Sequence, residues 1–486
     1  MTGIDDAINE AFRPIATAVV NFVFFSVPIG EAELPLIVVW LIAGALFFTV
    51  YLRLINIRGF LHAIRIVLGK EDKGSGAPGE VSHFQALTTA VSGTVGVGNI
   101  THVAVAISIG GPGATFWLIV AGFLGMASKF VECTLGVKYR QINADGSVSG
   151  GPMFYLDKGL SERGLPRLGK SLAWYYAIFL ILACLGAGNM FQANQAYVQF
   201  VNVTGGESSM FATRGWLFGS ILAILTALVI IGGIRSIARV TSKLVPFMAL
   251  LYVSTALVVI GANAAALPGA LVTIVREAFS PEGVTGGMFA VLILGFRRAA
   301  FSNEAGIGSA AIAHSAVRTK EPLTQGFVAM LEPFIDTVVI CTITALVITL
   351  TVYDPALLND GVISGVELTS SAFASVIPWF PYVLAVVVIL FAYSTMIAWS
   401  YYGLEGFIYI FGPKRWAKVT FNSIFCLFVI VGCTTQLDAV LDFSDAMIFA
   451  IALANVLGLY LLVPVVKREL DDYWARKRSD ARAPPR

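Results

Sequence analysis

The residues AVSGTVGVGNI, at positions 90–100, place three glycines and an asparagine inside a run that otherwise has the composition of a hydrophobic helix. Each glycine in a helix interior costs about 1 kcal/mol relative to alanine, and an unpaired backbone group in hydrocarbon costs still more. An unwound segment at membrane depth is therefore tolerated only where its backbone faces a cavity or a ligand. We predict that the helix breaks here and that its backbone forms a binding site.

A broken helix can bind both ends of an amino acid. The N-terminus of the second half-helix presents free N–H groups and about half a positive charge, which suits a carboxylate. The C-terminus of the first half-helix presents bare carbonyls, which suit Na⁺ or an ammonium group. We expect the substrate carboxylate at the backbone N–H groups of Val97, Gly98 and their neighbours Gly96 and Asn99.

A second interruption of the same kind lies at residues 301–315, FSNEAGIGSAAIAHS. Glycines can also serve close helix packing, and that explanation suits GGPGA at 110–114 well. Packing alone is the weaker explanation for two breaks at matched positions in the two halves of the chain. Phe301, Ser302 and Asn303 are expected to line the site from this second break.

Four amide side chains fall within seven residues of ACLGAGNMFQANQA, at 183–196. The ordinary explanation is hydrogen bonding between helices, worth about 0.6 kcal/mol per contact. Four amides exceed what packing needs, so we favour a pocket or a water-filled path. We assign Asn189 and Gln192 to the substrate pocket, which Thr94 and Trp399 are expected to close.

Hydroxyl groups in FAYSTMIAWSYYGLEG, at 391–406, complete a candidate ion site. Hard cations choose oxygen ligands. We predict Na⁺ between the carbonyls of Ser92 and Val95 and the hydroxyls of Ser394 and Thr395. The alternative is that both hydroxyls bond to their own helix.

Charged residues within the hydrophobic runs are functional candidates by default. Lys129 and Glu132 have the i,i+3 spacing of a structural ion pair. Glu332 and Asp336 lie deeper, where structure and coupling are equally good explanations, and Glu304 lies inside the second break, so all three are candidates for gating or coupling.

Arg297 and Arg298 suit an ion pair or a gate. The histidines make proton coupling possible without forming a metal-ligand set; they are His83, His102 and His314.

The chain has 486 residues, of which 57% are hydrophobic and 13% charged, where a soluble protein carries about a quarter charged residues. Long apolar runs between short charged loops are typical of an all-α polytopic membrane protein. We predict eleven spans, near 34–52, 83–109, 114–137, 171–201, 215–233, 244–267, 286–313, 325–352, 381–411, 416–434 and 446–466.

The basic residues predict the orientation of these spans. Of the 32 Lys and Arg residues, 26 lie in alternate loops and the C-terminal tail, and three lie in the opposite segments. Because basic residues favour the cytoplasmic side, we expect the N-terminus outside and the C-terminus inside a plasma membrane, the inner membrane of a bacterium.

The spans also predict the domain organisation. After the first span, ten remain in two sets of five, 83–267 and 286–466. An odd number inverts the second set relative to the first, as in inverted-repeat transporters. Residues 1–82 are expected to comprise an N-terminal segment outside the membrane with an interfacial helix at 15–30, then the first span, then a cytoplasmic loop. Residues 467–486 are expected to form a basic cytoplasmic tail.

Motifs of soluble enzymes are absent from the sequence, which predicts that the chain is not an enzyme. Gly93, Gly96 and Gly98 do not match the dinucleotide-binding pattern, and no strand is predicted before them. The sequence contains no P-loop, nucleophile elbow or HExxH motif.

The chain resembles the alanine/glycine:cation symporters. The resemblance rests on GVGNI with GGPGATFW, on SGGPMFYLDKGL at 149–160, and on FSNEAGIGSAAIAHSA with EPFIDT. It implies Na⁺- or H⁺-coupled uptake of alanine, glycine or similar small neutral amino acids by a single chain with the leucine-transporter-like fold. GVGN at 96–99 is similar to the GLGN of the neurotransmitter:sodium symporters, from which the carbonyl assignment follows.

Two departures from the family pattern bear on the substrate. The family usually has GNIxGVA where this chain has Thr101 and His102, and AGMGSAPIAHA where it has Ile307 and Ala311. If these side chains face the pocket, the preferred amino acid differs from alanine or glycine. The remaining alternatives are an H⁺-coupled symporter and, more remotely, a channel or a receptor.

Overall fold

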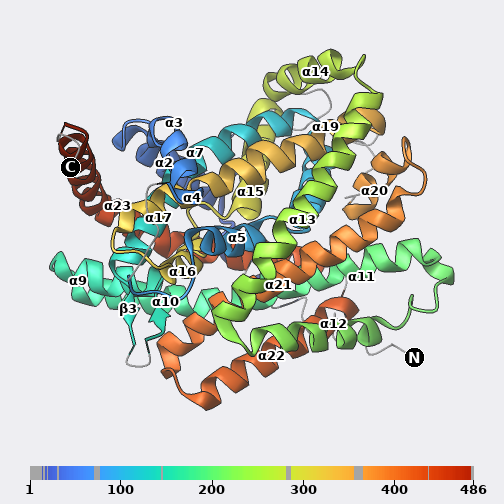
Figure 1. Ribbon diagram of the computed structural model, residues 1–486. Helices are drawn as coiled ribbons and strands as arrows, with labels where there is room; N and C mark the ends of the chain where they lie inside the picture. Colours follow the sequence, from blue (N-terminus) through green and yellow to red (C-terminus); the bar gives the residue numbers. More distant parts are fainter. Residues whose placement is uncertain are drawn as a thin grey trace.

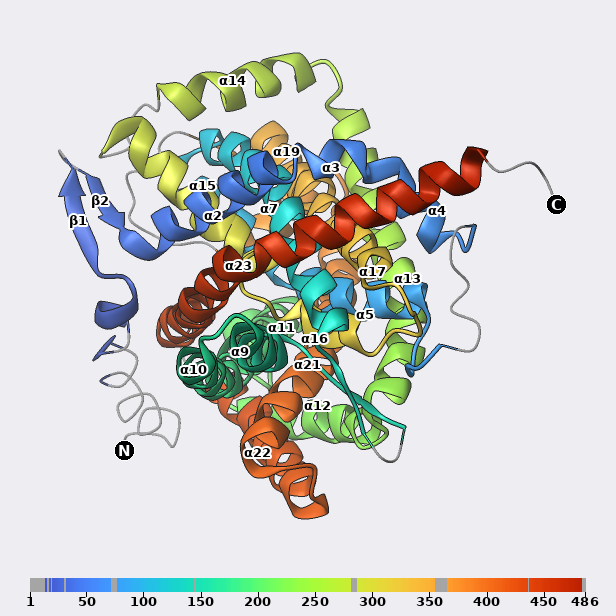
Figure 2. The same cartoon turned by 90° about the vertical axis from the view of Figure 1, so that its left-hand side faces the viewer.

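The computed structural model is a bundle of helices packed around one hydrophobic core (Figures 1 and 2). The structure describes residues 14, 17, 18, 20–29, 32–70, 77–143, 146–280, 286–354, 365–435 and 437–482.

Eight helical segments are long and apolar enough to cross a membrane. They are α5–α6 (His83–Gly110), α7 (Gly113–Lys138), α10–α11 (Pro166–Val203), α13 (Gly233–Ala262), α17–α19 (Pro322–Thr351), α21 (Phe380–Phe411), α22 (Arg415–Thr434) and Val440–Ser479 of α23 (Leu437–Arg482). Two shorter apolar helices are α2 (Leu36–Tyr51) and α12 (Gly215–Ile230).

These segments confirm a polytopic helical membrane protein. The run expected at 286–313 is divided into α15 (Gly287–Asn303) and α16 (Ala310–Ser315). The number of eleven spans and the inverted repeat stay predictions.

Short elements connect the long helices. They are α3 (Ile55–Arg58), α4 (Phe60–Val67), α8 (Pro152–Phe154), α9 (Leu160–Glu162), η3 (Gly206–Ser208), α14 (Leu267–Phe279) and α20 (Val366–Ala374). Three π-helical segments interrupt longer helices: η1 (Tyr155–Gly159), η2 (Gly186–Met190) and η4 (Phe334–Cys341). Single π turns are frequent at functional sites, and η4 carries Asp336.

The interfacial helix expected at 15–30 is wrong over its last residues. Ser26–Ile29 form strand β1, which pairs antiparallel with β2 (Ala32–Pro35). Strand pairing satisfies backbone groups that a short helix end would leave open, and Val27 and Pro28 have little helix propensity. A second pair, β3 (Gln141–Ile142) with β4 (Val148–Ser149), follows α7.

The interrupted helix α5–α6 lies at the centre of the bundle. Every residue of its apolar window is buried, whereas only 28% of the window of α13 is buried. Helices at the edge expose large apolar side chains such as Leu228 of α12 and Leu250 of α13. These exposed apolar faces suit contact with lipid and not with water. The outer helices therefore face the bilayer, and they shield the buried helix α5–α6 from lipid.

The start of α5 follows from its sequence. Ser82 and Gln85 form a capping box, in which the Gln85 N–H donates to Ser82 Oγ (3.2 Å) and the Ser82 N–H donates to Gln85 Oε1 (3.0 Å). These two bonds satisfy N–H groups that a helix start leaves open. The helix that carries the first break therefore has a defined beginning.

Candidate functional site

The first helix break lies where the sequence predicts it. Helix α5 ends at Thr94, Val95 takes an extended conformation, and α6 begins at Gly98. The Gly96 N–H donates to the side-chain oxygen of Asn99 (2.9 Å). The Asn99 side chain therefore replaces part of the missing helical hydrogen bonding inside the break.

The N–H groups beyond the break are only partly engaged. The Val97 N–H donates a long bond to Gln192 Oε1 (3.4 Å). The N–H groups of Gly98 and Asn99 have no hydrogen-bond acceptor within the described part of the chain. Because they stand at the positive end of α6, they are available to an anionic ligand group.

The carbonyl side of the break contacts α21. Thr395 Oγ1 donates to the carbonyl of Ser92 (3.0 Å). A Cβ at Gly96 would lie only 2.4 Å from Thr395 Oγ1, so this approach requires glycine. The Val95 carbonyl accepts no hydrogen bond from the described residues. The structure thus places the Ser92 carbonyl and the Thr395 hydroxyl, two of the four predicted ion-site groups, in contact.

The Ser394 hydroxyl bonds to its own helix, which is the alternative to an ion-ligand role. Its hydroxyl donates to the carbonyl of Phe391 in its own helix (3.0 Å). Its carbonyl accepts a hydrogen bond from Ser92 Oγ (2.7 Å). Ser394 is beside the break, but its hydroxyl points along α21.

The second break separates α15 from α16. Glu304, Gly306 and Gly308 have positive φ angles of 56°, 89° and 88°. The carbonyl of Gly306 accepts from Asn455 Nδ2 (2.9 Å), and the carbonyl of Ile307 accepts from the Tyr176 hydroxyl (2.9 Å). Side chains of α23 and α10 therefore satisfy backbone that unwinding has freed.

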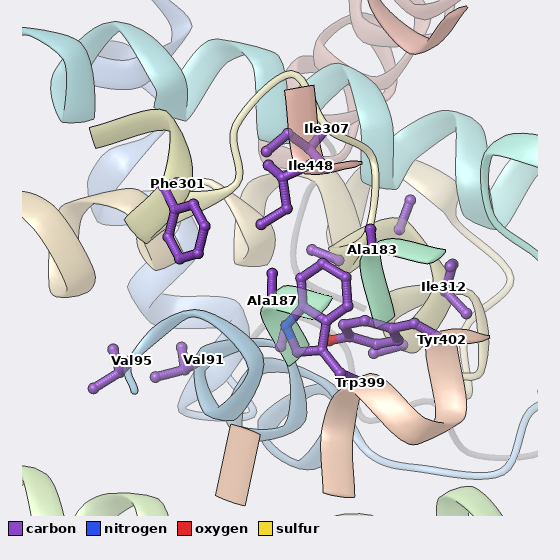
Figure 3. Close-up of a cluster of buried hydrophobic side chains, with 14 of the residues drawn as sticks. Val91, Val95, Ala183, Ala187, Phe301, Ile307, Ile312, Trp399, Tyr402 and Ile448 are labelled. Carbon is purple, nitrogen blue, oxygen red and sulfur yellow. The ribbon is translucent and has the colours of Figure 1, made fainter. Parts of the chain in front are cut away.

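Trp399 joins the two breaks. Its indole Nε1 lies 3.2 Å from the Gly93 carbonyl at the end of α5 and 3.1 Å from Glu304 Oε1 in the second break. The other Glu304 oxygen accepts a hydrogen bond from Ser309. In Figure 3 the indole lies beside Ala187 and Tyr402, with Phe301 on the second broken helix. One side chain thus contacts both interruptions, and its role in closing a substrate pocket stays a prediction.

Asp336 is a second junction between the breaks. Its carboxylate accepts hydrogen bonds from Asn99 Nδ2 (2.6 Å), Ser302 Oγ (2.8 Å) and Thr337 Oγ1 (2.7 Å). It is fully buried and has no ion-pair partner among the described residues. Asn303 bonds to Thr337 Oγ1 (2.9 Å) on the same segment. A buried carboxylate without a cation needs such hydrogen bonds.

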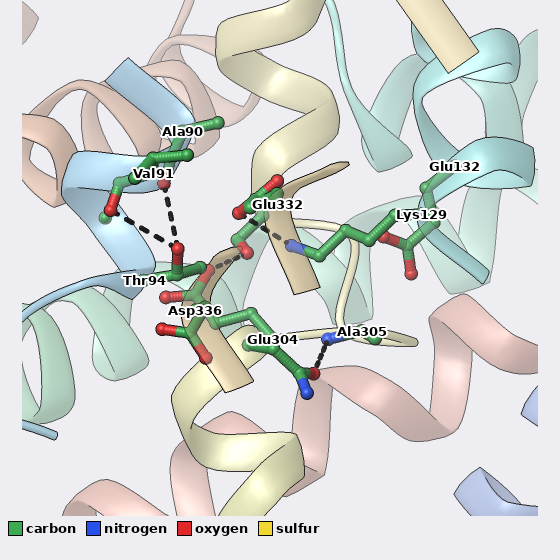
Figure 4. Close-up of polar contacts among 12 residues, drawn as sticks. Ala90, Val91, Thr94, Lys129, Glu132, Glu304, Ala305, Glu332 and Asp336 are labelled. Atoms are coloured by element: carbon green, nitrogen blue, oxygen red, sulfur yellow. Dashed lines mark hydrogen bonds and ion pairs between the residues drawn. The ribbon is translucent and has the colours of Figure 1, made fainter. Parts of the chain in front are cut away.

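The predicted ion pair of Lys129 with Glu132 is wrong. Lys129 Nζ lies 3.2 Å from Glu332 Oε1, and both side chains are fully buried (Figure 4). Glu132 instead accepts a hydrogen bond from Asn455 Nδ2 (3.0 Å). The reason is that α18 (Leu331–Pro333) packs against α7 on the side of Lys129, whereas Glu132 faces α23.

Some predicted pocket residues bond elsewhere. Asn189 Nδ2 donates to the carbonyl of Phe425 on α22 (2.6 Å), which is the interhelical bond of the ordinary explanation. The Thr94 hydroxyl lies 3.4 and 3.3 Å from the carbonyls of Ala90 and Val91 in its own helix. Of the two predicted amides, only Gln192 contacts the first break.

A cluster of charges lies one turn beyond the first break. Arg297 and Arg298 both donate to Asp445 Oδ2, at 2.8 and 3.1 Å, which confirms the ion-pair reading of the two arginines. The His102 ring stacks on Phe301 with centroids 3.9 Å apart. Asp445 and Asn455 are functional-site neighbours that were not predicted, although Asn455 is a polar residue in the apolar run 446–466 and Asp445 directly precedes that run.

The far end of α16 is anchored from outside the membrane-spanning helices. The Arg140 guanidinium donates to the carbonyls of Ser315 (2.8 Å), Val317 (2.5 Å), Thr319 (2.8 Å) and Pro78 (2.9 Å). Burial lowers the pKa of this guanidinium from its usual value. Arg140 therefore fixes the end of the second broken helix.

A polytopic helical membrane protein in which two interrupted helices meet at buried polar groups has the architecture of a secondary transporter. The model of the sodium:alanine symporter family matches residues 21–485. The chain belongs to this family, and it is a transporter and not an enzyme.

Several relatives share nearly the whole chain. The sodium/alanine symporter AgcS of Methanococcus maripaludis is 38% identical over 92% of this chain and 96% of that protein. The amino-acid carrier protein AlsT of Bacillus subtilis is 35% identical over 90% of this chain and 89% of its own length. The probable sodium/glutamine symporter GlnT of Bacillus subtilis is 33% identical, with coverage of 91% and 89%.

Proposed function

We propose that this protein takes up a small neutral amino acid, such as alanine or glycine, together with Na⁺ by alternating access. The observation that carries the proposal is the open backbone of the first break. The N–H groups of Gly98 and Asn99 lie on one side of it and the Val95 carbonyl on the other, all without hydrogen-bond partners in the described part of the chain. These groups match a carboxylate and a cation, respectively.

The substrate site in this proposal is built from both breaks. The carboxylate binds at Gly96, Val97, Gly98 and Asn99, with Gln192 beside them. Trp399, Phe301, Ser302, Asn303 and Thr94 close the pocket. Asn189 contributes its side-chain oxygen, because its Nδ2 bonds to α22 whereas its Oδ1 has no partner among the described residues. Na⁺ binds at Ser92, Val95 and Thr395, and the carbonyl of Ser394 supports that site.

The buried acids serve gating and coupling in this proposal. Glu304 contacts Trp399, and Asp336 contacts Asn99 and Ser302, so a shift of either broken helix changes their hydrogen bonds. Glu332 forms the ion pair with Lys129 beside them. Interactions that differ between two states of a protein are what a transport cycle requires.

The architecture in this proposal is an eleven-span chain with a five-plus-five inverted repeat, which works as a single chain. The N-terminus lies outside and the C-terminus in the cytoplasm, because 26 of the 32 basic residues lie in segments that this orientation places inside.

Uptake into proteoliposomes tests the proposed function. A labelled amino-acid panel should accumulate with an inward Na⁺ gradient and not when choline replaces Na⁺. Counterflow of labelled alanine separates a carrier from a channel, which shows none. Equal accumulation in choline with a proton gradient would contradict Na⁺ coupling and favour the H⁺-coupled alternative.

A further inference from the structure

His102 lies on α6 one helical turn beyond Gly98 and is only 1% exposed. Its ring stacks on Phe301 at 3.9 Å between centroids and is tilted against Phe191 at 5.0 Å. The ring therefore occupies a fixed position on the same helix face as the N-terminal residues of α6, because residues four apart share a face.

The neighbour of His102 determines which ring nitrogen carries the hydrogen. His102 Nδ1 lies 2.9 Å from Arg298 Nη1. A guanidinium has donors and no acceptor, so Nδ1 must accept and carries no hydrogen. The hydrogen of the neutral ring is therefore on Nε2. Arg298 is itself held by Asp445 (3.1 Å), which keeps the guanidinium in place.

His102 Nε2 is a buried donor without an acceptor among the described residues. Buried polar groups in proteins are nearly always hydrogen-bonded, so an exception calls for an explanation. No charged or polar side chain that the structure describes completes this bond. The remaining types of partner are a water molecule and a ligand group, and the position of the ring beside Gly98 favours a ligand group.

The ring edge next to Nε2 lies beside Gly98, the first residue of α6. The Cδ2 atom, which is bonded to Nε2, lies 3.7 Å from the position of a Cβ on Gly98, and Phe301 lies 3.9 Å from the same position. The N–H of Gly98 also lacks an acceptor in the described chain. Two unpartnered donors, one from the backbone of Gly98 and one from the side chain of His102, thus belong to residues one turn apart on α6 whose side-chain positions are in contact.

We propose that His102 is a substrate-binding residue whose Nε2–H donates to the substrate carboxylate, beside the N–H groups at the start of α6. This inference rests on the proposed function and adds one contact to it. Arg298 acts as a positioning residue, because it selects the tautomer without touching the substrate. The ligand group is a carboxylate because both donors lie at the positive end of a helix.

The test is alanine binding to the purified protein in detergent with saturating Na⁺, measured by calorimetry. His102→Phe retains an aromatic ring for stacking on Phe301 and removes the donor. We expect the Kd for alanine to rise about 10- to 100-fold, the range for a hydrogen bond to a charged group. His102→Gln, which keeps an N–H donor, should recover part of this loss.

The matched control is His62→Phe, the same substitution at a buried histidine of α4 whose Nε2 bonds to Tyr473 (2.7 Å). It should leave the Kd for alanine unchanged. Size-exclusion and thermal unfolding profiles establish that each variant is folded. If His102→Phe does not fold, the comparison of His102→Gln with His102→Ala replaces it, and equal Kd values for these two would overturn the inference.

A second measurement identifies the substrate group that His102 contacts. Alanine should lose more affinity than alaninamide in His102→Phe, because only alanine has the carboxylate. Loss of affinity confined to competitors with polar side chains would overturn the inference, as would an unchanged Kd for alanine. Failure of the unsubstituted protein to bind any amino acid of the panel would instead overturn the proposed function and this inference with it.

Discussion

Single glycines and single hydrogen bonds determine how closely the helices approach at the first break. Gly96 faces Thr395 Oγ1 at a distance that no larger residue permits, and Trp399 Nε1 reaches one carbonyl and one carboxylate from opposite breaks. These three residues are predicted site residues, Gly96 and Trp399 for the substrate and Thr395 for Na⁺, but the contacts among them were not predicted. The hydrogen bond from the Gly96 N–H to Asn99 Oδ1 inside the break could not be predicted, because it depends on the backbone conformation of residues 95–98.

Gly96→Ala should weaken Na⁺ coupling. The added Cβ would lie 2.4 Å from Thr395 Oγ1, so the broken segment and the Thr395 side chain would have to move apart. Overpacking of this kind costs about 1–3 kcal/mol, so we expect the Na⁺ concentration for half-maximal uptake to rise about tenfold or more. Gly269→Ala is the control, since nothing lies within 4 Å of its added Cβ. Equal Na⁺ dependence in the two variants would contradict the close approach.

Trp399→Phe should lower alanine uptake because both indole hydrogen bonds disappear while an aromatic ring stays. Glu304 then keeps only its bond from Ser309 among the described side chains. Leaving a buried acceptor without its donor costs about 1–3 kcal/mol, so we expect transport efficiency to fall about 5- to 100-fold. Trp174→Phe, at a 39% exposed residue of α10, should have no effect. Uptake measured with labelled alanine decides between these outcomes.

At the scale of the elements, the positions of the two helix breaks could be predicted from the sequence. The helices and side chains that contact the breaks could not. Glycine and polar residues in an apolar run indicate an unwound segment from local sequence alone. The partner of Lys129 depends on a contact between distant parts of the chain, because Glu332 lies 203 residues further on. The partner of Asn189 could not be predicted either. An amide in a membrane helix suits a pocket or a neighbouring helix equally well, and the packing of α22 determines that its Nδ2 bonds to the Phe425 carbonyl.

Lys129→Met should destabilise the contact of α7 with α18. The substitution leaves Glu332 buried without its cation, and breaking such a pair costs about 3–5 kcal/mol. We expect a clear fall in the thermal unfolding midpoint in detergent. The same substitution at Lys138, whose partner Glu469 is 29% exposed, should change it little.

The double variant Lys129→Met with Glu332→Gln tests the reason for that fall. Removing both charges removes the uncompensated carboxylate, so much of the stability should return. A double variant as unstable as Lys129→Met alone would show that Glu332 is not the partner that matters.

For the whole molecule, composition predicted the membrane class, and the family follows from similarity over nearly the entire chain. The uneven charge distribution predicts the orientation. In a background without the five native cysteines, Ser479→Cys should react with an impermeant thiol reagent only after permeabilisation, and Glu207→Cys should react in intact cells. The reverse pattern would contradict the proposed orientation.

The central test is the Na⁺ concentration for half-maximal alanine uptake, measured in proteoliposomes that contain the Thr395→Ala or the Ser394→Ala variant. This concentration reports Na⁺ coupling at the first break. Thr395 Oγ1 contacts the Ser92 carbonyl, whereas the Ser394 hydroxyl bonds to its own helix. Thr395→Ala should therefore raise the half-maximal Na⁺ concentration about tenfold or more, and Ser394→Ala should change it far less. At saturating Na⁺ both variants should keep near-normal alanine affinity. Unchanged Na⁺ dependence in Thr395→Ala, or full uptake by the unsubstituted protein in choline, would contradict a Na⁺ site between these helices.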